Sequence, residues 1–96
     1  MRSVDVRRVM GTGVRRHGTR VVVVRAPGNG ATAVVAGRKV GGAVERNRAR
    51  RILRAALRET RKDLSATQDV ILVARASIRG CGTKDLVSDL RELMRT

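Results

Sequence analysis

The most informative absences in this chain of 96 residues are aromatic side chains and long apolar runs. Phe, Tyr and Trp do not occur, so the core has to be built from Val, Leu, Ile, Ala and Met, which bury less apolar area per residue than aromatic rings do. No apolar run approaches the length of about 18–20 residues that a membrane-spanning helix needs, and no signal-peptide h-region follows Met1. We therefore expect a small aliphatic core and no membrane span.

Cysteine, histidine and acidic residues are also scarce, which limits the chemistry that the protein can carry out itself. Cys81 is the only cysteine and His17 the only histidine, so an internal disulfide is impossible and a Cys/His dyad would join two residues far apart in the sequence. His17, in a stretch rich in Gly and Arg, is an exposed loop residue or a stacking or phosphate contact. The eight acids show no metal-ligand spacing. We assign no catalytic residue and no metal ligand, and the unpaired cysteine is typical of a reducing cytoplasm.

Among the charged residues of the chain, positive ones dominate. Twenty-two Lys and Arg against eight Asp and Glu give a formal net charge of +14 and a pI of about 12.0. Such a charge points first to nucleic acid and second to anionic membrane surfaces, and the absence of Trp and Phe argues against an interfacial helix. Because like charges repel in a compact chain, we expect a bound polyanion to stabilise the folded state.

Hydrophobic periodicity and turn residues divide the chain into six elements in the order α-β-β-α-β-α. Two β-branched segments flanking a Pro/Gly/Asn turn predict an antiparallel hairpin, and an almost wholly apolar third strand should be central in the sheet. The pattern predicts an α/β (α+β) two-layer sandwich in a single domain over residues 1–96. The elements are a helix capped by Ser3 and ending near Gly11–Gly13, strands Arg20–Arg25, Ala31–Ala36 and Asp69–Ala74, a hinge at Gly37–Gly42, a helix from Ala43 to about Lys62, and a last helix capped by Thr83.

The helix that begins at Ala43 carries most of the charge. Residues 38–62 contain ten Lys and Arg against Glu45 and Glu59, a local net charge of +8. An aliphatic stripe occupies an arc of about 140° on one side of this helix, and arginines occupy the other. Few acids are interleaved, so neighbouring arginines repel each other by a few tenths of a kcal/mol per pair. A polyanion partner explains such a face better than a solvated surface does. The stripe consists of Ala49, Ile52, Leu53, Ala56, Leu57 and Thr60.

The same stretch carries a recognisable motif. The segment Lys39-Val40-Gly41-x-Ala43-Val44-x-Arg46-Asn47-Arg48-x-x-Arg51-x-x-Arg54 resembles the signature of the bacterial ribonuclease P protein component, the small basic subunit of the ribonucleoprotein that processes tRNA. Weaker similarity extends over the whole chain, through the first helix, the valine strand and the strand that begins at Asp69. The resemblance implies the same element order, with an uncommon left-handed crossover around the basic helix.

What the resemblance implies about function is specific. In this family the RNA subunit hydrolyses the phosphodiester with Mg²⁺, while the protein aids substrate and metal binding, so the implied partners are ribonuclease P RNA and precursor tRNA, with no membrane and no small-molecule substrate. A cleft between the first helix and the sheet receives the single-stranded 5′ leader, and it would be lined here by Val6, Met10, Val22 and Val24. The implied RNA-binding residues are Arg38, Lys39, Arg46, Asn47, Arg48, Arg50, Arg51 and Arg54.

The chain departs from the family pattern in three places. The cleft positions usually carry aromatic side chains, and base–aromatic stacking contributes about 1–3 kcal/mol per base, so leader affinity should be weaker here or rest more on charge. Gly37 stands where the family often has Ser. Relatives usually carry a basic segment ahead of the first helix, whereas Met1 lies almost at it, so fewer RNA contacts are expected there. The alternative function is that of a structural, ribosomal-type RNA-binding protein, which would not require the ordered Arg46-Asn47-Arg48 signature.

Overall fold

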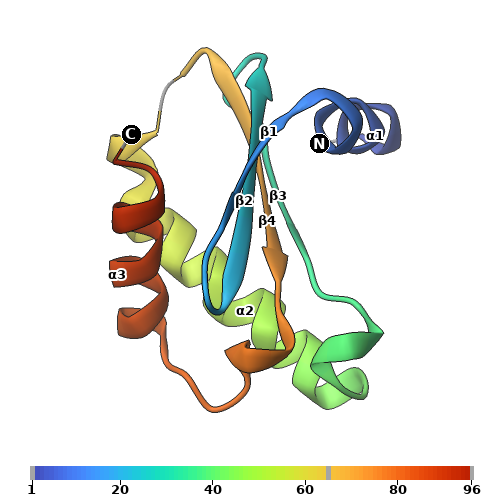
Figure 1. Ribbon diagram of the computed structural model, residues 1–96, viewed down its shortest axis with the longest axis vertical. Helices are drawn as coiled ribbons and strands as arrows, with labels where there is room; N and C mark the ends of the chain where they lie inside the picture. Colours follow the sequence, from blue (N-terminus) through green and yellow to red (C-terminus); the bar gives the residue numbers. More distant parts are fainter. Residues whose placement is uncertain (1, 65, 96) are drawn as a thin grey trace.

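The computed structural model describes residues 2–64 and 66–95, and these contain three α-helices and four strands (Figure 1). The order is α-β-β-β-α-β-α, with one strand more than the sequence predicts. The elements are α1 Ser3–Thr12, β1 Val14–His17, β2 Val21–Pro27, β3 Thr32–Val35, α2 Ala43–Thr60, β4 Gln68–Ala74 and α3 Thr83–Leu93, with 3₁₀ turns η1 Arg38–Val40, η2 Arg61–Asp63 and η3 Ala76–Ile78.

The four strands form one mixed sheet in the order β1-β2-β4-β3. Strand β2 pairs antiparallel with β1 and β4, whereas β3 pairs parallel with β4. The predicted central position of the apolar strand is confirmed, because β4 lies between two neighbours and is buried along most of its length. Its register places Val73 opposite both Val22 of β2 and Val35 of β3.

The predicted hairpin between the second and third segments is wrong, because β4 lies between β2 and β3. The turn residues carry the chain across the end of β4 instead of back along β2. The carboxylate of Asp69 in β4 accepts hydrogen bonds from the backbone N–H groups of Asn29 and Ala31, both at 2.9 Å. These contacts join residues 40 and 38 positions apart in the sequence, so local turn chemistry does not reveal them.

Strand β1 is the element that the sequence pattern does not predict, and His17, expected in a loop, is its last residue. Three of its four residues are polar, and three are exposed, so it has no buried face that would leave an apolar alternation in the sequence. It is defined by its partner: Val14 lies opposite Arg25 of β2, and His17 lies opposite Val22.

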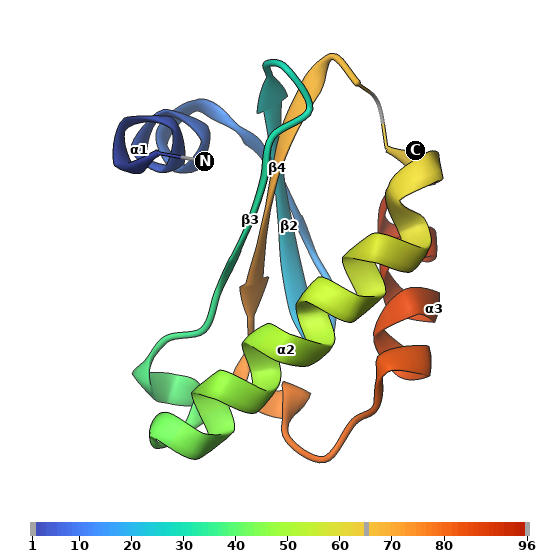
Figure 2. The ribbon, with the colours of Figure 1, turned by 180° about the vertical axis from the view of Figure 1, so that it is seen from behind.

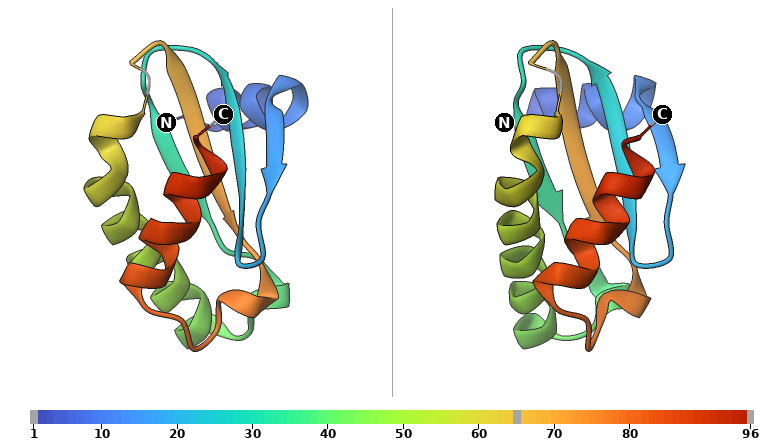
Figure 3. Two further views of the ribbon diagram at one scale, coloured as in Figure 1. Left: turned by 60° about the vertical axis from the view of Figure 1, so that its left-hand side comes forward. Right: turned by 90° about the vertical axis from the view of Figure 1, so that its left-hand side faces the viewer.

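The consecutive valines of β2 contribute to both faces of the sheet. Val21 and Val23 belong to the larger core cluster, between the sheet and helices α2 and α3. Val24 belongs to a smaller cluster beneath α1, with Val9 and Ile71. Figure 3 shows α2 and α3 on one side of the sheet and α1 crossing the other side near one end. One end of the sheet is therefore covered on both faces.

Two helices begin one residue away from the predicted caps. The N-cap of α1 is Arg2 and not Ser3, and the N-cap of α3 is Gly82 and not Thr83. In each case an acid three positions later satisfies the cap. Asp5 accepts the backbone N–H of Arg2 at 3.3 Å, and Asp85 accepts that of Gly82 at 2.9 Å. The acids of the first turn therefore define these ends, through half of a capping box.

Helix α2 has the two predicted faces. Its buried residues are Ala49, Leu53, Ala56, Leu57 and Thr60, and Ile52 is half-buried beside them. Like every helix in the described part of the chain, α2 is not long and apolar enough to cross a membrane. It connects the parallel neighbours β3 and β4 as the crossover of a βαβ unit (Figure 2). The left-handed sense of this crossover stays a prediction.

Candidate nucleic-acid interface

The outward side of α2 presents a row of arginines. Arg51, Arg54 and Arg58 are exposed, and Arg50 is half-buried. Arg50 donates a hydrogen bond to Oδ1 of Asn47, three residues earlier, which joins two side chains of the signature. No ion pair between described residues involves any of these four arginines. Unneutralised guanidinium groups held on one rigid helix are suited to binding phosphate.

Two further arginines of the signature are half-buried. Nη2 of Arg48 donates a hydrogen bond of 2.7 Å to the carbonyl oxygen of Cys81, which ties α2 to the loop that precedes α3. Nε of Arg46 is buried and has no hydrogen-bond partner among the described residues. Leaving a buried donor unsatisfied costs about 1–3 kcal/mol. An acceptor brought by a ligand would offset that cost at Arg46, whereas Arg48 already has a structural contact.

The basic turn η1 lies directly ahead of α2. Arg38 and Lys39 are exposed, while Val40 is buried and anchors the turn in the core. Gly41 follows with φ of 143°, and a Cβ at this position would stand 3.0 Å from Cβ of Glu45. Glycine therefore allows the chain to enter α2 directly after the turn. As a result, the charges of the turn are continuous with those of the helix.

The residues predicted to line a leader cleft come together on one side of the sheet, which we call the α1 face. Val24 is fully buried at the centre of the cluster beneath α1. Val6 and Met10 of α1 and Val22 of β2 are half-buried and pack around that cluster. Because Val24 has no exposed surface, only the other three can meet a ligand in this structure. Their role in leader binding stays a prediction.

The open part of the α1 face includes residues that the sequence pattern does not indicate. Val35 and Val73 are half-buried and lie beside Val22. Together these valines form an apolar floor on the α1 face. Arg15 of β1 is exposed and donates a hydrogen bond of 2.6 Å to the carbonyl oxygen of Met10, at the edge of this floor. The floor is therefore aliphatic, and Arg15 places positive charge at its edge. The sequence indicates only that Val35 and Val73 lie in strands. It does not indicate which face of the sheet they occupy, because the pairing of β3 with β4 decides that.

One charged cluster fixes α1 against the sheet. Arg8 of α1 forms an ion pair with Asp69, which is buried at the start of β4. The pKa of Asp69 lies below its ordinary value of 3.8, because the backbone N–H of Ala31, that of Asn29 and the Arg8 guanidinium favour the ionised form more than burial opposes it. A Cβ at Gly28 would stand 2.1 Å from Oδ2 of Asp69, so the chain passes close to this carboxylate only because residue 28 has no side chain. Asp69 thus positions α1 and the β2–β3 connection.

Among the described residues, reactive groups are not gathered at either surface. Cys81 is buried, and burial raises the pKa of its thiol, which disfavours the nucleophilic thiolate. In residues 2–64 and 66–95, no three His, Cys, Asp or Glu side chains gather in a way that could hold a metal ion. What the described residues do offer is exposed positive charge on α2 and η1, which can bind a polyanion.

The fold and the surface together define a small basic α+β protein that displays its charge on the helix between two parallel strands. The chain belongs to the ribonuclease P protein family, because the family model Ribonuclease P matches residues 2–96. It is similar to the ribonuclease P protein components of two Dehalococcoides mccartyi strains, 195 and CBDB1, each 55% identical over 42 residues, or 44% of this chain. These 42 residues span 33% of the length of those relatives.

Solved structures of bacterial ribonuclease P proteins share the whole fold. The protein from Thermotoga maritima superposes with a TM-score of 0.82 and 19% identity, covering 100% of this chain and 96% of that one. The protein from Staphylococcus aureus gives a TM-score of 0.79 and 20% identity, covering 99% and 90%. At these identities the likeness establishes the α+β architecture.

Proposed function

We propose that this protein is the protein subunit of ribonuclease P and that it binds the catalytic RNA through α2 and the turn ahead of it. The observation that carries the proposal is that Asn47, Arg51 and Arg54 of the signature are exposed on α2 and form no ion pair among the described residues, while the opposite face is embedded in the core. A helix fixed in this way holds its guanidinium forks in a constant register for phosphate oxygens. The proposed contacts are Arg38, Lys39, Arg46, Asn47, Arg48, Arg50, Arg51 and Arg54.

A second part of the proposal assigns the 5′ leader of precursor tRNA to the α1 face. The floor formed by Met10, Val22 and Val73 is half-buried and apolar, and Arg15 and His17 at its side are exposed. Aliphatic side chains can pack against bases and sugars, although they do not stack as aromatic rings do. Leader binding would therefore depend on phosphate contacts and on shape, with little discrimination between bases.

We assign the chemical step to the RNA. Hydrolysis of the phosphodiester would use Mg²⁺ held by the RNA, and the protein would aid substrate and metal binding by reducing phosphate repulsion and positioning the leader. No residue of this chain is proposed to hold Mg²⁺ or to transfer a proton. We expect the protein to work in the cytoplasm, where its proposed substrate is processed.

A reconstitution assay tests the proposal directly. The protein is combined with a bacterial ribonuclease P RNA at a low Mg²⁺ concentration at which the RNA alone is slow, and release of the 5′ leader from precursor tRNA is followed. We expect stimulation by the wild-type protein and by Lys84→Gln, which removes one exposed charge from α3, and weaker stimulation by Arg51→Gln. If wild-type protein binds the RNA without any stimulation, the alternative of a structural RNA-binding protein is favoured.

A further inference from the structure

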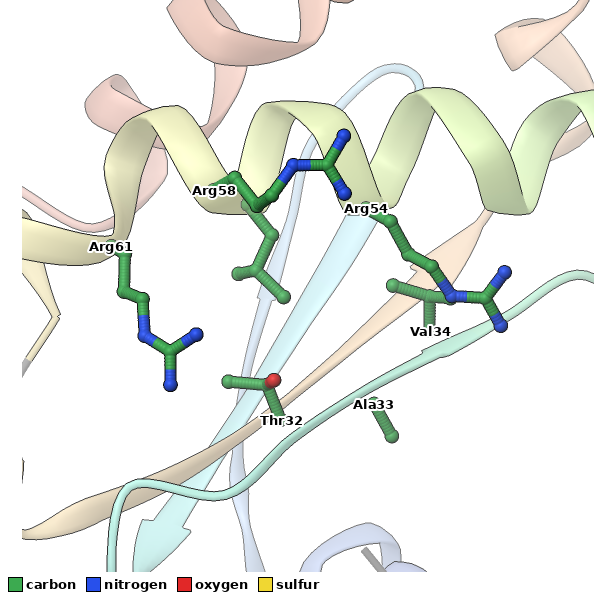
Figure 4. Close-up of a pocket in the computed structure, with 7 residues that line it drawn as sticks. Thr32, Ala33, Val34, Arg54, Arg58 and Arg61 are labelled. Atoms are coloured by element: carbon green, nitrogen blue, oxygen red, sulfur yellow. The ribbon is translucent and has the colours of Figure 1, made fainter.

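A pocket of about 210 Å³ lies between the C-terminal part of α2 and the edge strand β3. Apart from Arg54, none of the side chains that surround it belongs to the signature. Figure 4 shows the three arginine side chains extending from α2 and η2, with Thr32 and Val34 on strand β3 below them. The lining residues are Thr32, Ala33, Val34, Arg54, Leu57, Arg58 and Arg61.

Three arginines line this pocket. Arg54 and Arg58 are one turn apart on the same side of α2, and Arg61 follows in the 3₁₀ turn η2. Figure 4 shows the Arg61 side chain extending toward Thr32 and the Arg58 guanidinium directed toward Arg54. All three residues are exposed, and no ion pair or hydrogen bond between described residues engages their guanidinium groups. Such a concentration of like charge is electrostatically unfavourable unless an anion is bound.

The opposite wall supplies complementary groups. Thr32 contributes a hydroxyl that can donate to an anion, and buried Leu57 with half-buried Val34 gives an apolar surface beside it. Strand β3 is the outer strand of the described sheet and pairs only with β4 there, so its other edge leaves backbone N–H groups available. The pocket therefore combines planar charged donors, neutral donors and an apolar wall.

We propose that Arg54, Arg58 and Arg61, together with Thr32, form a pocket that binds a phosphodiester group of RNA at the β3 edge. Arginine forks bind phosphate oxygens bidentately, and the apolar wall accommodates the adjoining ribose. The inference rests on the proposed function and extends the RNA surface beyond the signature to Arg58, Arg61 and Thr32.

The place of the pocket in the fold determines which RNA strands can reach it. Thr32 and Val34 face α2, whereas Ala33 and Val35 also pack against the cluster on the α1 face. The β3 edge is thus the border between the proposed surface for the catalytic RNA and the proposed surface for the leader. A phosphate in the pocket belongs either to the catalytic RNA or to a leader that passes over this edge.

Direct binding to the pocket can be measured by NMR on full-length, ¹⁵N-labelled protein. Inorganic phosphate and a short oligoribonucleotide are titrated separately while the arginine Nε–H signals and the Thr32 amide are followed. We expect saturable shifts of Arg58, Arg61 and Thr32 with the oligonucleotide. Equal, non-saturating shifts of all arginines would overturn the proposal. This measurement needs no ribonuclease P RNA, so it can succeed or fail independently of the proposed function.

Variants then identify the source of the phosphate. Arg58→Gln, Arg61→Gln and the control Lys84→Gln are compared for binding to ribonuclease P RNA alone, and in the holoenzyme for binding to precursor tRNA and to mature tRNA without a leader. Each lost phosphate contact should reduce the slope of log affinity against log salt by about 0.7–0.9. A change with RNA alone assigns the phosphate to the catalytic RNA, and a change confined to precursor tRNA assigns it to the leader. If Arg58→Gln and Arg61→Gln give the same salt slopes as Lys84→Gln with every RNA, the pocket does not bind phosphate and the proposal is wrong.

Discussion

At the scale of single residues, the contacts of each arginine determine its role. Arg8 forms an ion pair with Asp69, and Arg20 forms one with Asp89. These side chains hold elements together. Arg51, by contrast, is exposed and has no acidic partner among the described residues. Substituting an arginine of the first kind should therefore reduce stability, and substituting Arg51 should reduce RNA binding.

Asp69 makes the stability of the protein sensitive to acid. Because its pKa is lower in the folded protein than the ordinary 3.8, the folded state binds the proton less readily than the unfolded state does. Its stabilising contribution is therefore complete above the unfolded-state pKa and is lost as pH falls through the folded-state pKa. Urea midpoints measured from pH 7 to pH 3 should fall less steeply for Asp69→Asn than for wild type. Identical pH dependence in the two proteins would contradict this role.

The absence of aromatic residues from the α1 face can be tested by adding one. Val22 is half-buried on the open floor, so Val22→Phe places a ring where a leader base could stack. We expect leader affinity of the holoenzyme to rise by about 1–3 kcal/mol for one stacked base. Val14→Phe is the matched control, because Val14 is 65% exposed on β1, in the register that faces away from α1. Equal effects of the two variants would argue against a leader on the α1 face.

At the scale of the elements, α2 has a core-packing face and, opposite it, the face proposed to bind RNA. Its aliphatic face is part of the main core, so the backbone from which its arginines extend is held as firmly as the core itself. Truncating an outward arginine should consequently leave the fold intact. This separation makes α2 suitable for mutational analysis, since loss of binding can be distinguished from loss of structure.

Arg51→Ala tests α2 as the RNA-facing element. The substitution should leave the urea midpoint almost unchanged, because Arg51 is exposed and the new residue favours helix. The slope of log affinity for ribonuclease P RNA against log salt should fall by about 0.7–0.9. Filter binding at several salt concentrations measures it, with Lys84→Ala as the control on α3. If the slope is unchanged, another element faces the RNA.

Elements with an apolar face were predictable from the sequence, and those without one were not. The helices and the strands β2, β3 and β4 have such faces, and their positions were confirmed to within a few residues. Strand β1 has a polar sequence and was missed. The pairing of β3 was also wrong, because the Asp69 contacts that separate it from β2 join distant segments. At the candidate site, the signature arginines were found from their order, whereas Val35 and Val73 were missed because strand register places them.

At the scale of the whole molecule, net charge and core size together suggest dependence on the partner. A charge of +14 on 96 residues, with a core built without aromatic rings, leaves the folded state opposed by its own repulsion. In the proposed complex, RNA would bind the folded surface and neutralise that charge. Folding and assembly should therefore be thermodynamically linked in this protein.

Thermal unfolding measures this linkage. A ligand present at 100 times its Kd stabilises a protein by about 2.7 kcal/mol, and each kcal/mol raises the Tm of a domain this small by about 4–8 °C. We therefore expect the Tm to rise by more than 10 °C in saturating polyphosphate or RNA, and to rise with added salt. Polyethylene glycol, an uncharged polymer, is the control. A Tm that does not respond to polyanion or salt would show that charge repulsion does not limit stability.

The sequence by itself determined the chemistry of the protein. Residue counts established the positive charge and the lack of reactive groups, and the order of residues from Lys39 to Arg54 indicated the family, because both are properties of the chain that folding leaves unchanged. Only the tertiary structure decided which groups share a surface. The insertion of β4 between β2 and β3 brings Val22 and Val35 to one floor, and it places Thr32 beneath Arg58 and Arg61. Such neighbours are set by pairing between distant segments, which local periodicity does not encode.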